Sequence, residues 1–452
     1  MKRFFSLILV ILMIFAYSPI YASAKNKDKN SEDLTAVNSV NIEWWKEFND
    51  PILTDYIIKA IQYNNDLKIS TLKTEEAKQT KNIVRADEMP TLGVGAVPAL
   101  YKLPTLTQSH GFISLPLYAN YEVDLFGKNR DKTKAMDKIY EISKLNEKSA
   151  YISVVSAVGS VYFNTVKLDE LIAIQEQIVQ DRKKIYDLMK LSNEEGLIST
   201  ADTVNANKAY LKATNDLYEL QKTRERLLNS LAVLTGENPN NTNDFKRISY
   251  EDINLTKQIP DSVSSEIIQS RPDYMAAEKL VEKSGIDVRV AKKEFLPTID
   301  ILGMLSFNSS DLFLKKMNWT NASAILGAGV ALPLFTGGKK IANLKLKKNQ
   351  YEQVLEKYQK TNLTSIQEVN DSLSDLKLDT EKYNKTLESL KAEEQSFYYT
   401  NLKYKEGVIS NLDLLQNRET LFVTRKAAAN DKINCFIDQI SLYKAVGGQN
   451  IN

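Results

Sequence analysis

Two hydrophobic patterns divide the chain: strict alternation in short segments and helical spacing over very long ones. From Ile113 to Leu125 every second residue is apolar, and Ser, Pro, Tyr, Asn and acidic residues fill the positions between them. Such alternation predicts a β-strand with one apolar face. The same signal recurs near 319–334 and more weakly in two further segments. The sequence therefore predicts four strands, at about 91–101, 112–125, 298–308 and 319–334.

Each predicted strand has about ten residues, the length that crosses a bilayer at a tilt. Four strands cannot close a transmembrane barrel, because an open edge in lipid leaves backbone groups without hydrogen bonds and known barrels begin at eight strands. We therefore expect a barrel shared between chains, with eight strands from two chains or twelve from three. A soluble sandwich is the alternative, but long flanking helices fit it poorly.

Helical spacing dominates the two stretches that lack proline, 117–238 and 334–452. Apolar seams such as Ile152, Val155, Val158 and Tyr162 run between flanks rich in Lys, Glu, Gln and Asp. A polar helix with a narrow apolar seam is typical of a coiled coil. The sequence predicts helical hairpins at 128–235 and 339–446, whose first legs would each be roughly 100 Å long at 1.5 Å per residue.

One short motif interrupts both hairpins: "EGLISTAD" at 195–202 and "EGVISNLD" at 406–413. Glycine tolerates the left-handed geometry that ends a helix, and Ser-x-x-Asp resembles a capping box that starts one. Each motif therefore predicts the tip of a hairpin. Two interpretations of Asp202 and Asp413 stay open, helix capping alone or a functional acidic ring, and both can hold together.

The two halves are a tandem duplication, because "MPTLGVGA" at 89–96 matches "LPTIDILG" at 296–303 and "VDLFGK" matches "LPLFTGGK". The fold class predicted is mainly α with a membrane β-barrel, built from a duplicated unit of two strands and a long helical hairpin. The expected division is a signal peptide at 1–24, an N-terminal periplasmic and equatorial segment at 25–63, a first repeat at 64–253 and a second repeat at 254–452.

The N-terminus predicts export. Lys2 and Arg3 precede an apolar run, and Ala22 and Ala24 give the small-x-small pattern of a signal-peptidase site. An uncleaved membrane anchor is the alternative, although the run is short for a spanning helix. The only cysteine is Cys435, which we expect to be a small apolar residue in a helix. No cysteine follows the signal segment, so the protein is not expected to be a lipoprotein.

Composition narrows the function. The formal net charge of +2 falls to 0 once Lys2 and Arg3 are removed, which gives no reason to expect nucleic acid. The single histidine, His110, cannot make a metal cluster and is expected in a surface loop. No nucleophile–base set or Gly-rich phosphate loop is found. We therefore expect no enzyme activity, no cofactor and no metal.

The chain resembles the TolC family of outer-membrane efflux channels, most closely the branch that serves resistance-nodulation-division pumps. The resemblance covers nearly the whole mature chain. It is carried by "WWKEFNDP" at 44–51, "YEVDLFGK" at 121–128, "SRPDYMAAE" at 270–278, "LPT" at 296–298, "PLFTGGK" at 333–339 and "LYKAVGG" at 442–448.

The resemblance implies a homotrimer with a twelve-stranded barrel in outer-membrane lipid and a helical barrel in the periplasm. It further implies a constriction at the tips, where a periplasmic adaptor docks and couples the channel to an inner-membrane pump. Asp413 matches an acidic gate position, and Asp202 is its counterpart. Ile409 stands where some members carry a basic latch. The docking residues expected are Gly196, Leu197, Ile198, Ser199, Gly407, Val408, Ile409 and Ser410, with Ile198 and Ile409 exposed.

Three functions remain in view. The first is the passive outer-membrane duct of a tripartite efflux pump for small toxic compounds. The second, on the same fold, is the outer channel of a type I protein-secretion system; the Trp-Trp and Arg-Pro-Asp segments favour efflux. The third is a periplasmic coiled-coil scaffold with no pore, which would not need alternating strands.

Overall fold

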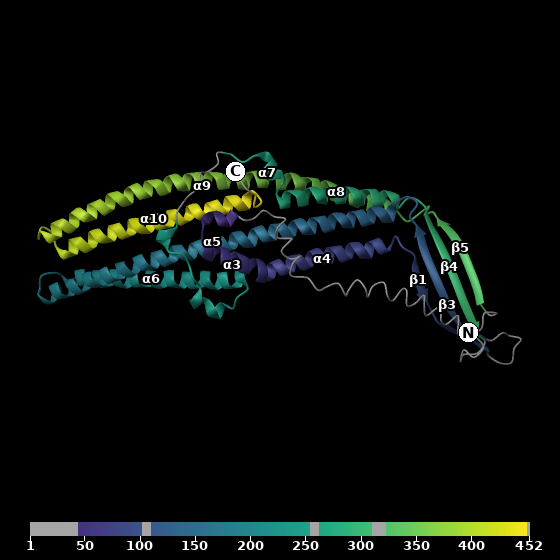
Figure 1. Cartoon of the computed structure of the whole chain (residues 1–452), viewed down its shortest axis with the longest axis horizontal. Helices are drawn as coiled ribbons and strands as arrows, with labels where there is room; N and C mark the ends of the chain where they lie inside the picture. Colours follow the sequence, from purple (N-terminus) through teal and green to yellow (C-terminus); the bar gives the residue numbers. More distant parts are fainter. Residues whose placement is uncertain (1–43, 102–109, 254–261, 310–321, 450–452) are drawn as a thin grey trace.

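The computed structural model describes residues 44–101, 110–253, 262–309 and 322–449. The expected signal peptide at 1–24 lies outside the described residues, as does most of the two loops expected between paired strands. The molecule is long and narrow, with a β-sheet at one end and two helical tips at the other (Figure 1).

Long helices make up most of the described chain. Two 3-10 helices, η2 (Pro239–Asp244) and η3 (Tyr250–Asp252), follow the first hairpin, and η1 (Trp44–Phe48) precedes α3. The α-helices are α3 (Pro51–Tyr63), α4 (Asn65–Ala86), α5 (Lys128–Glu194), α6 (Thr200–Thr235), α7 (Ser265–Gln269), α8 (Pro272–Lys293), α9 (Lys339–Lys405) and α10 (Asn411–Ala445).

Helices α5 and α9 each have 67 residues and run from the sheet to the tips (Figure 1). Glycines with positive φ precede both: Gly127 at 69° and Gly338 at 82°. The left-handed conformation lets the chain leave the sheet and enter the helix sharply. Helices α6 and α4 lie along α5, and α10 and α8 lie along α9.

Two corresponding joints connect these shorter helices end to end. Asn64 caps α4, and its side-chain amide donates to the carbonyl of Leu234 in α6 at 2.9 Å. In the second repeat, Arg271 precedes α8 and its Nη1 donates to the carbonyl of Ala445 in α10 at 2.7 Å. Each repeat therefore presents two legs of nearly full height, one continuous and one jointed.

The sheet is antiparallel throughout, in the order β1, β3, β4, β5, and β2 also pairs with β3. The described chain thus leaves β5 at one edge and β1 with β2 at the other. The strands are β1 (Thr91–Val94), β2 (Val97–Tyr101), β3 (His110–Val123), β4 (Thr298–Ser309) and β5 (Ala322–Ala331).

The first predicted strand, 91–101, is interrupted in the structure. β1 and β2 keep one register against β3, since Val94 faces Leu117 and Val97 faces Ser114. Between them Gly95 donates its N–H to the carbonyl of Pro116 at 2.9 Å, but proline has no N–H to return. The prediction of four strands therefore holds for the path of the chain, with one local break in the ladder.

The alternating residues fall on one face of the whole sheet. Leu117 pairs with Leu305, which pairs with Ala324, while Ile301 pairs with Ala328. The opposite face carries polar groups, including Ser114 and Ser306, whose hydroxyls lie 2.6 Å apart. Since register preserves the faces across every strand, the single chain already builds an apolar wall with a mixed, partly polar reverse side.

The largest core lies at mid-length, where η1 and α3 pack on α5, α6 and α10. Trp44 stacks on Tyr443 with ring centroids 5.0 Å apart. The buried hydroxyl of Tyr162 donates to Asp50 at 2.5 Å, and Asp50 also caps α3. This core joins the Trp-Trp segment to the end of α10, two of the segments that carry the family resemblance.

Several sequence predictions change in detail. The strand expected at about 112–125 ends at Val123, and the one expected at 319–334 ends at Ala331. His110 begins β3, so the prediction that it lies in a surface loop was wrong. Cys435 is buried in α10, as expected. Within the described ranges, no helix has the length and apolarity to span a membrane, and no three His, Cys, Asp or Glu side chains are placed to hold a metal.

Candidate functional site

Both hairpin tips end their first helix in the same way. Gly196 has φ of 73° and Gly407 has φ of 72°. In the first tip, Leu197 N–H donates to the Ser192 carbonyl at 2.8 Å; in the second, Val408 N–H makes the same bond to Lys403 at 2.8 Å. This is the Schellman arrangement, in which a left-handed glycine closes the helix.

Both tips also begin their second helix in the same way. The Ser199 hydroxyl donates to the carboxylate of Asp202 at 2.7 Å and accepts the Asp202 N–H at 3.2 Å. Ser410 and Asp413 repeat these bonds at 2.7 and 3.1 Å. Two capping boxes are therefore confirmed, and the motif is a complete turn unit.

The exposed side chains at the tips differ from those expected. Leu197 is 76% exposed and Val408 is 70% exposed. Ile198 and Ile409, which were expected to be exposed, are half-buried. The residue that follows each glycine points into solvent, whereas the isoleucine turns back towards its hairpin. The apolar positions open to a partner are thus one residue earlier in each motif.

The two acidic residues of the motif are exposed. Hydrogen bonds from the Ser410 hydroxyl and N–H lower the pKa of Asp413 below its ordinary value. A carboxylate with such donors stays ionised at neutral pH. Within one chain, Asp413 is therefore a capping group that keeps its negative charge.

Two adjacent ion pairs join α5 of the first hairpin to α10 of the second, on the sheet side of the tips. The sequence analysis did not predict them. Arg418 of α10 donates through Nε to the buried carboxylate of Asp181 in α5 at 2.6 Å and makes a second bond through Nη2. Arg182 donates to Glu419 at 2.6 Å. The signal was present: each helix places an adjacent acid and base at the same height, in opposite order.

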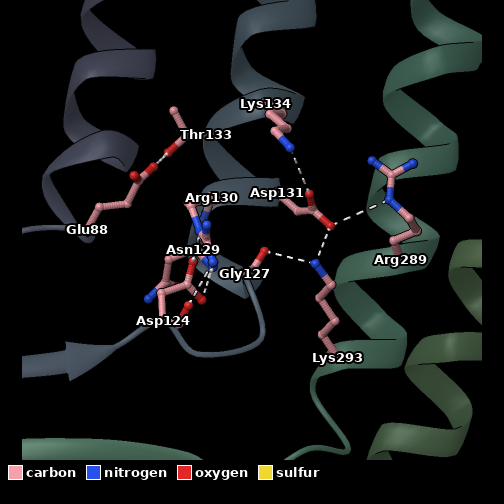
Figure 2. Close-up of polar contacts among 10 residues, drawn as sticks. All are labelled: Glu88, Asp124, Gly127, Asn129, Arg130, Asp131, Thr133, Lys134, Arg289 and Lys293. Carbon is pink, nitrogen blue, oxygen red and sulfur yellow. Dashed lines mark hydrogen bonds and ion pairs between the residues drawn. The ribbon is translucent and has the colours of Figure 1, made fainter.

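A second polar cluster lies where the helices meet the sheet (Figure 2). The Asp131 carboxylate accepts from Lys293 at 2.7 Å, and Arg289 and Lys134 also lie within ion-pair distance. Burial opposes the charge of Asp131, but Lys293 and Arg289 outweigh it and lower its pKa. Lys293 also donates to the carbonyl of Gly127, the residue that precedes α5. The cluster thus fixes the end of α8 to the start of α5.

Two carboxyl groups face each other between α9 and α10. Burial first, and then the neighbouring Asp379 and Asp375, raise the pKa of Asp438 to about 7. The interaction with Asp379 favours protonated Asp438, and the Oδ2 of Asp438 is buried with no hydrogen-bond partner among the described residues. The positions 211 residues earlier are Leu168 and Leu227, which pack in one apolar cluster. Only the second repeat therefore titrates here.

This architecture and its sequence are similar to those of known proteins. The family model described as "Outer membrane efflux protein" matches residues 57–237 and 263–448. The toluene efflux pump outer membrane protein TtgC of Pseudomonas putida is 27% identical over 416 residues, which cover 90% of this chain and 84% of that protein. The probable outer membrane lipoprotein SilC of Salmonella typhimurium is 25% identical, with 91% and 89% covered.

A solved structure agrees with both. The crystal structure of the Campylobacter jejuni CmeC outer membrane channel superposes with a TM-score of 0.83 at 25% identity, covering 90% of this chain and 88% of that one. The sheet, the two long hairpins and the tips described above are therefore shared with a known channel fold.

Proposed function

The chain belongs to the outer membrane efflux protein family, and we propose that three copies form the passive outer-membrane duct of a tripartite efflux pump. A periplasmic adaptor and an inner-membrane pump would complete the assembly. The cargo proposed is a small toxic compound; the name of TtgC, for instance, specifies toluene. The family name specifies efflux and the outer membrane, which supports the proposal of a transport duct without enzyme activity.

The observation that carries the proposal is the sheet. Its apolar face runs in register through all four strand paths, and its two edges are β5 on one side and β1 with β2 on the other. An apolar wall suits lipid, but unpaired edges do not. Three chains would close twelve strands around a lumen, because more than eight strands are needed for an open channel.

The mass of the detergent-purified protein tests the assembly, together with its conductance in planar bilayers. We expect a trimer and discrete channel openings. A stable monomer or dimer would contradict the twelve-strand arrangement, and a trimer that never conducts would favour the periplasmic scaffold. An export assay with small dyes and with a secreted polypeptide separates efflux from the type I secretion alternative.

We further propose that the adaptor docks on the tips, from Gly196 to Ser199 and from Gly407 to Ser410. Support comes from the exposed apolar side chains of Leu197 and Val408 on rigidly capped turns. Photo-crosslinkers at these two positions should capture the adaptor strongly. A crosslinker at exposed Lys377, in mid-helix, is the matched control, and equal capture there would refute tip docking.

The gate is proposed to be a ring of Asp413 side chains, with a smaller contribution from Asp202. In a trimer, like charges confined near the axis would attract cations and raise one another's pKa, against the lowering caused by Ser410. Asp413→Asn removes the charge and keeps an acceptor for capping. Loss of cation selectivity and divalent-cation block, with intact trimers, is the expected result; unchanged conductance would leave Asp413 with capping alone.

Two further assignments are part of the proposal. The family match falls into two segments separated by 238–262, which supports the division into a first repeat at 64–253 and a second at 254–452. The mature chain is proposed to lack a lipid anchor, because its only cysteine is buried Cys435, although SilC is named a lipoprotein. Mass spectrometry of the mature N-terminus tests the second assignment.

A further inference from the structure

The helix ends beneath one side of the sheet form a strongly basic surface. The last residues of α8, 289–293, and the first residues of α9, 339–348, contain eight basic residues and no acidic residue. Strands β4 and β5 end at the same level, because Thr298, Ala331, Lys293 and Lys340 line one cavity of about 500 Å³. Glu122, Asp124 and Glu294 also line this cavity, so the excess positive charge lies outside it, on the helix ends next to the sheet.

Half of these cations already have partners. Arg289 and Lys293 lie against Asp131 (Figure 2), Lys340 donates to the carbonyl of Glu294, and Lys347 donates to Gln350. The other four have no ion pair with any residue in the described part of the chain, and all four are exposed. We call these four the basic rim: Lys292, Lys339, Lys345 and Lys348.

The height of the basic rim matches a lipid headgroup layer. If the sheet spans the hydrocarbon core, the headgroup layer extends about 5–8 Å beyond it. Lys292 and Lys339 lie at the helix ends nearest the sheet, and Lys345 lies about 9 Å further along α9 at 1.5 Å per residue. Lysine side chains reach several ångströms towards an interface. Lys348, about 14 Å along, still acts within a Debye length of that layer.

Apolar side chains stand directly beside the basic rim. Leu334 and Phe335, between β5 and α9, are each 89% exposed in the single chain. Exposed apolar residues flanked by lysines are typical of a surface that lies in a membrane interface. The corresponding turn of the first repeat carries the matching pair Leu125 and Phe126, which are less exposed, at 61% and 39%. It also carries Asp124, which accepts hydrogen bonds from Asn129 and Arg130.

From this arrangement we infer that the basic rim binds the headgroups of anionic phospholipids in the periplasmic leaflet of the outer membrane. The phosphate of phosphatidylglycerol supplies the negative charge, and Leu334 and Phe335 contact its acyl chains. The inference rests on the proposed function only in that the sheet must span the membrane. It adds a lipid site that anchors the second repeat at its junction.

Native mass spectrometry of the full-length protein in detergent tests the inference. Phosphatidylglycerol or phosphatidylcholine is titrated, and bound lipids are counted on the trimer. Each lysine near an anionic surface contributes roughly fivefold in affinity, so the wild type should prefer phosphatidylglycerol by at least about tenfold. The variant Lys292→Gln/Lys339→Gln/Lys345→Gln/Lys348→Gln should lose this preference. The double variant Lys339→Gln/Lys345→Gln should lose part of it, and serves if the quadruple variant fails to fold.

The matched control removes four exposed lysines far from the sheet, Lys208→Gln/Lys212→Gln/Lys377→Gln/Lys391→Gln, and should keep the preference. An unchanged preference in the rim variants, or equal loss in the control, would overturn the inference. Suppression by millimolar inorganic phosphate would also overturn it, since the site would then be a free-phosphate site. Absence of trimers or conductance in the wild type would instead count against the proposed function.

Discussion

Helices α5 and α9 occupy equivalent places in the two repeats and have the same length, but their surroundings differ greatly. Twenty-one residues of α5 are buried, whereas only Ser365, Val369 and Leu376 are buried in α9. α5 packs on α3, α4, α6, α8 and α10, and α9 packs mainly on α8 and α10. The same backbone is thus the centre of the chain in one repeat and its outer face in the other.

The two repeats thus share the same helix length, but equivalent side chains differ in how far they are buried. Ile152 is 4% exposed, and Leu363, 211 positions later, is 69% exposed. Val155 and Ile366 differ in the same direction, at 1% and 39%. Apolar residues retained on the open side of α9 are explained if a second chain covers them. The buried residues of α5 therefore stabilise the single chain, whereas the exposed apolar residues of α9 would lie between chains in the proposed trimer.

The largest expected effect comes from substitutions at the equivalent positions Ile152 and Leu363. Ile152→Ala should destabilise the folded chain by about 3 kcal/mol, through lost burial and a cavity. Leu363→Glu should leave helicity unchanged but reduce the trimer fraction, because it places a charge in the proposed interface. Circular dichroism and native mass measurement report the two effects, with Leu363→Met as the control. Intact trimers with Leu363→Glu would show that this face is not an interface.

The two joints provide the next test. Arg271 is 6% exposed and donates hydrogen bonds to Ala445, Asp273 and Glu368. Asn64 caps α4, and its side-chain amide donates one hydrogen bond, to Leu234. Arg271→Ala should cost about 2–3 kcal/mol, since its acid partners are half-exposed and regain water. Asn64→Ala should cost about 1 kcal/mol. Thermal unfolding decides the order; equal costs would show that the joints are energetically alike.

The carboxyl pair predicts a pH dependence confined to the second repeat. The pKa of Asp438 rises from 3.8 to about 7 in the folded protein. The stabilising contribution of its protonated form is full below pH 4 and is lost as pH rises through 7. Between pH 5 and 8 the loss should be about 1–2 kcal/mol after allowing for partial exposure.

Unfolding measured at both pH values, with Asp438→Asn as the comparison, isolates this effect. The variant should show a smaller loss of stability between pH 5 and 8 than the wild type. Leu227→Asn at the equivalent place in the first repeat should destabilise equally at both pH values. If Asp438→Asn retains the wild-type pH dependence, other groups are responsible.

The smallest expected effect concerns the tips. Asn193 donates to the carbonyl of Ile198 at 2.9 Å, and Thr203 donates to Met189 at 3.3 Å; Tyr404 and Leu414 hold the same positions in the second tip. Asn193→Ala should cost about 1 kcal/mol locally, which is roughly a fivefold faster amide exchange around 195–200. Exchange around 406–411 should not change, and a change in both tips would indicate that they are coupled.

The sequence predicted the fold class because its signals were local and repeated. Glycine and Ser-x-x-Asp specified the tips, and alternation specified the apolar face of the sheet. The break at Gly95 was less accessible, since it depends on which residue of β3 lies opposite. The proline involved, Pro116, lies 21 residues away from Gly95, and no pattern within 91–101 reveals it.

The parts of the site that sequence reasoning missed depend on contacts between distant segments. Asp181 and Arg418 are 237 positions apart, and each alone resembles an ordinary charged residue on a polar helix. The exposure of Leu197 rather than Ile198 follows from the exact turn geometry after Gly196. A motif predicts such a turn, but the direction of each side chain requires coordinates.

Each long helix is also a lever. With 67 residues, α5 measures about 100 Å. Its end next to the sheet is held by Lys293, which donates hydrogen bonds to Gly127 and Asp131. A rotation of about 3° around that fulcrum carries the far end through about 5 Å, close to one turn of helix. Widening at the tips thus requires almost no movement at the sheet, so the part of the molecule in the membrane can stay still while the other end moves.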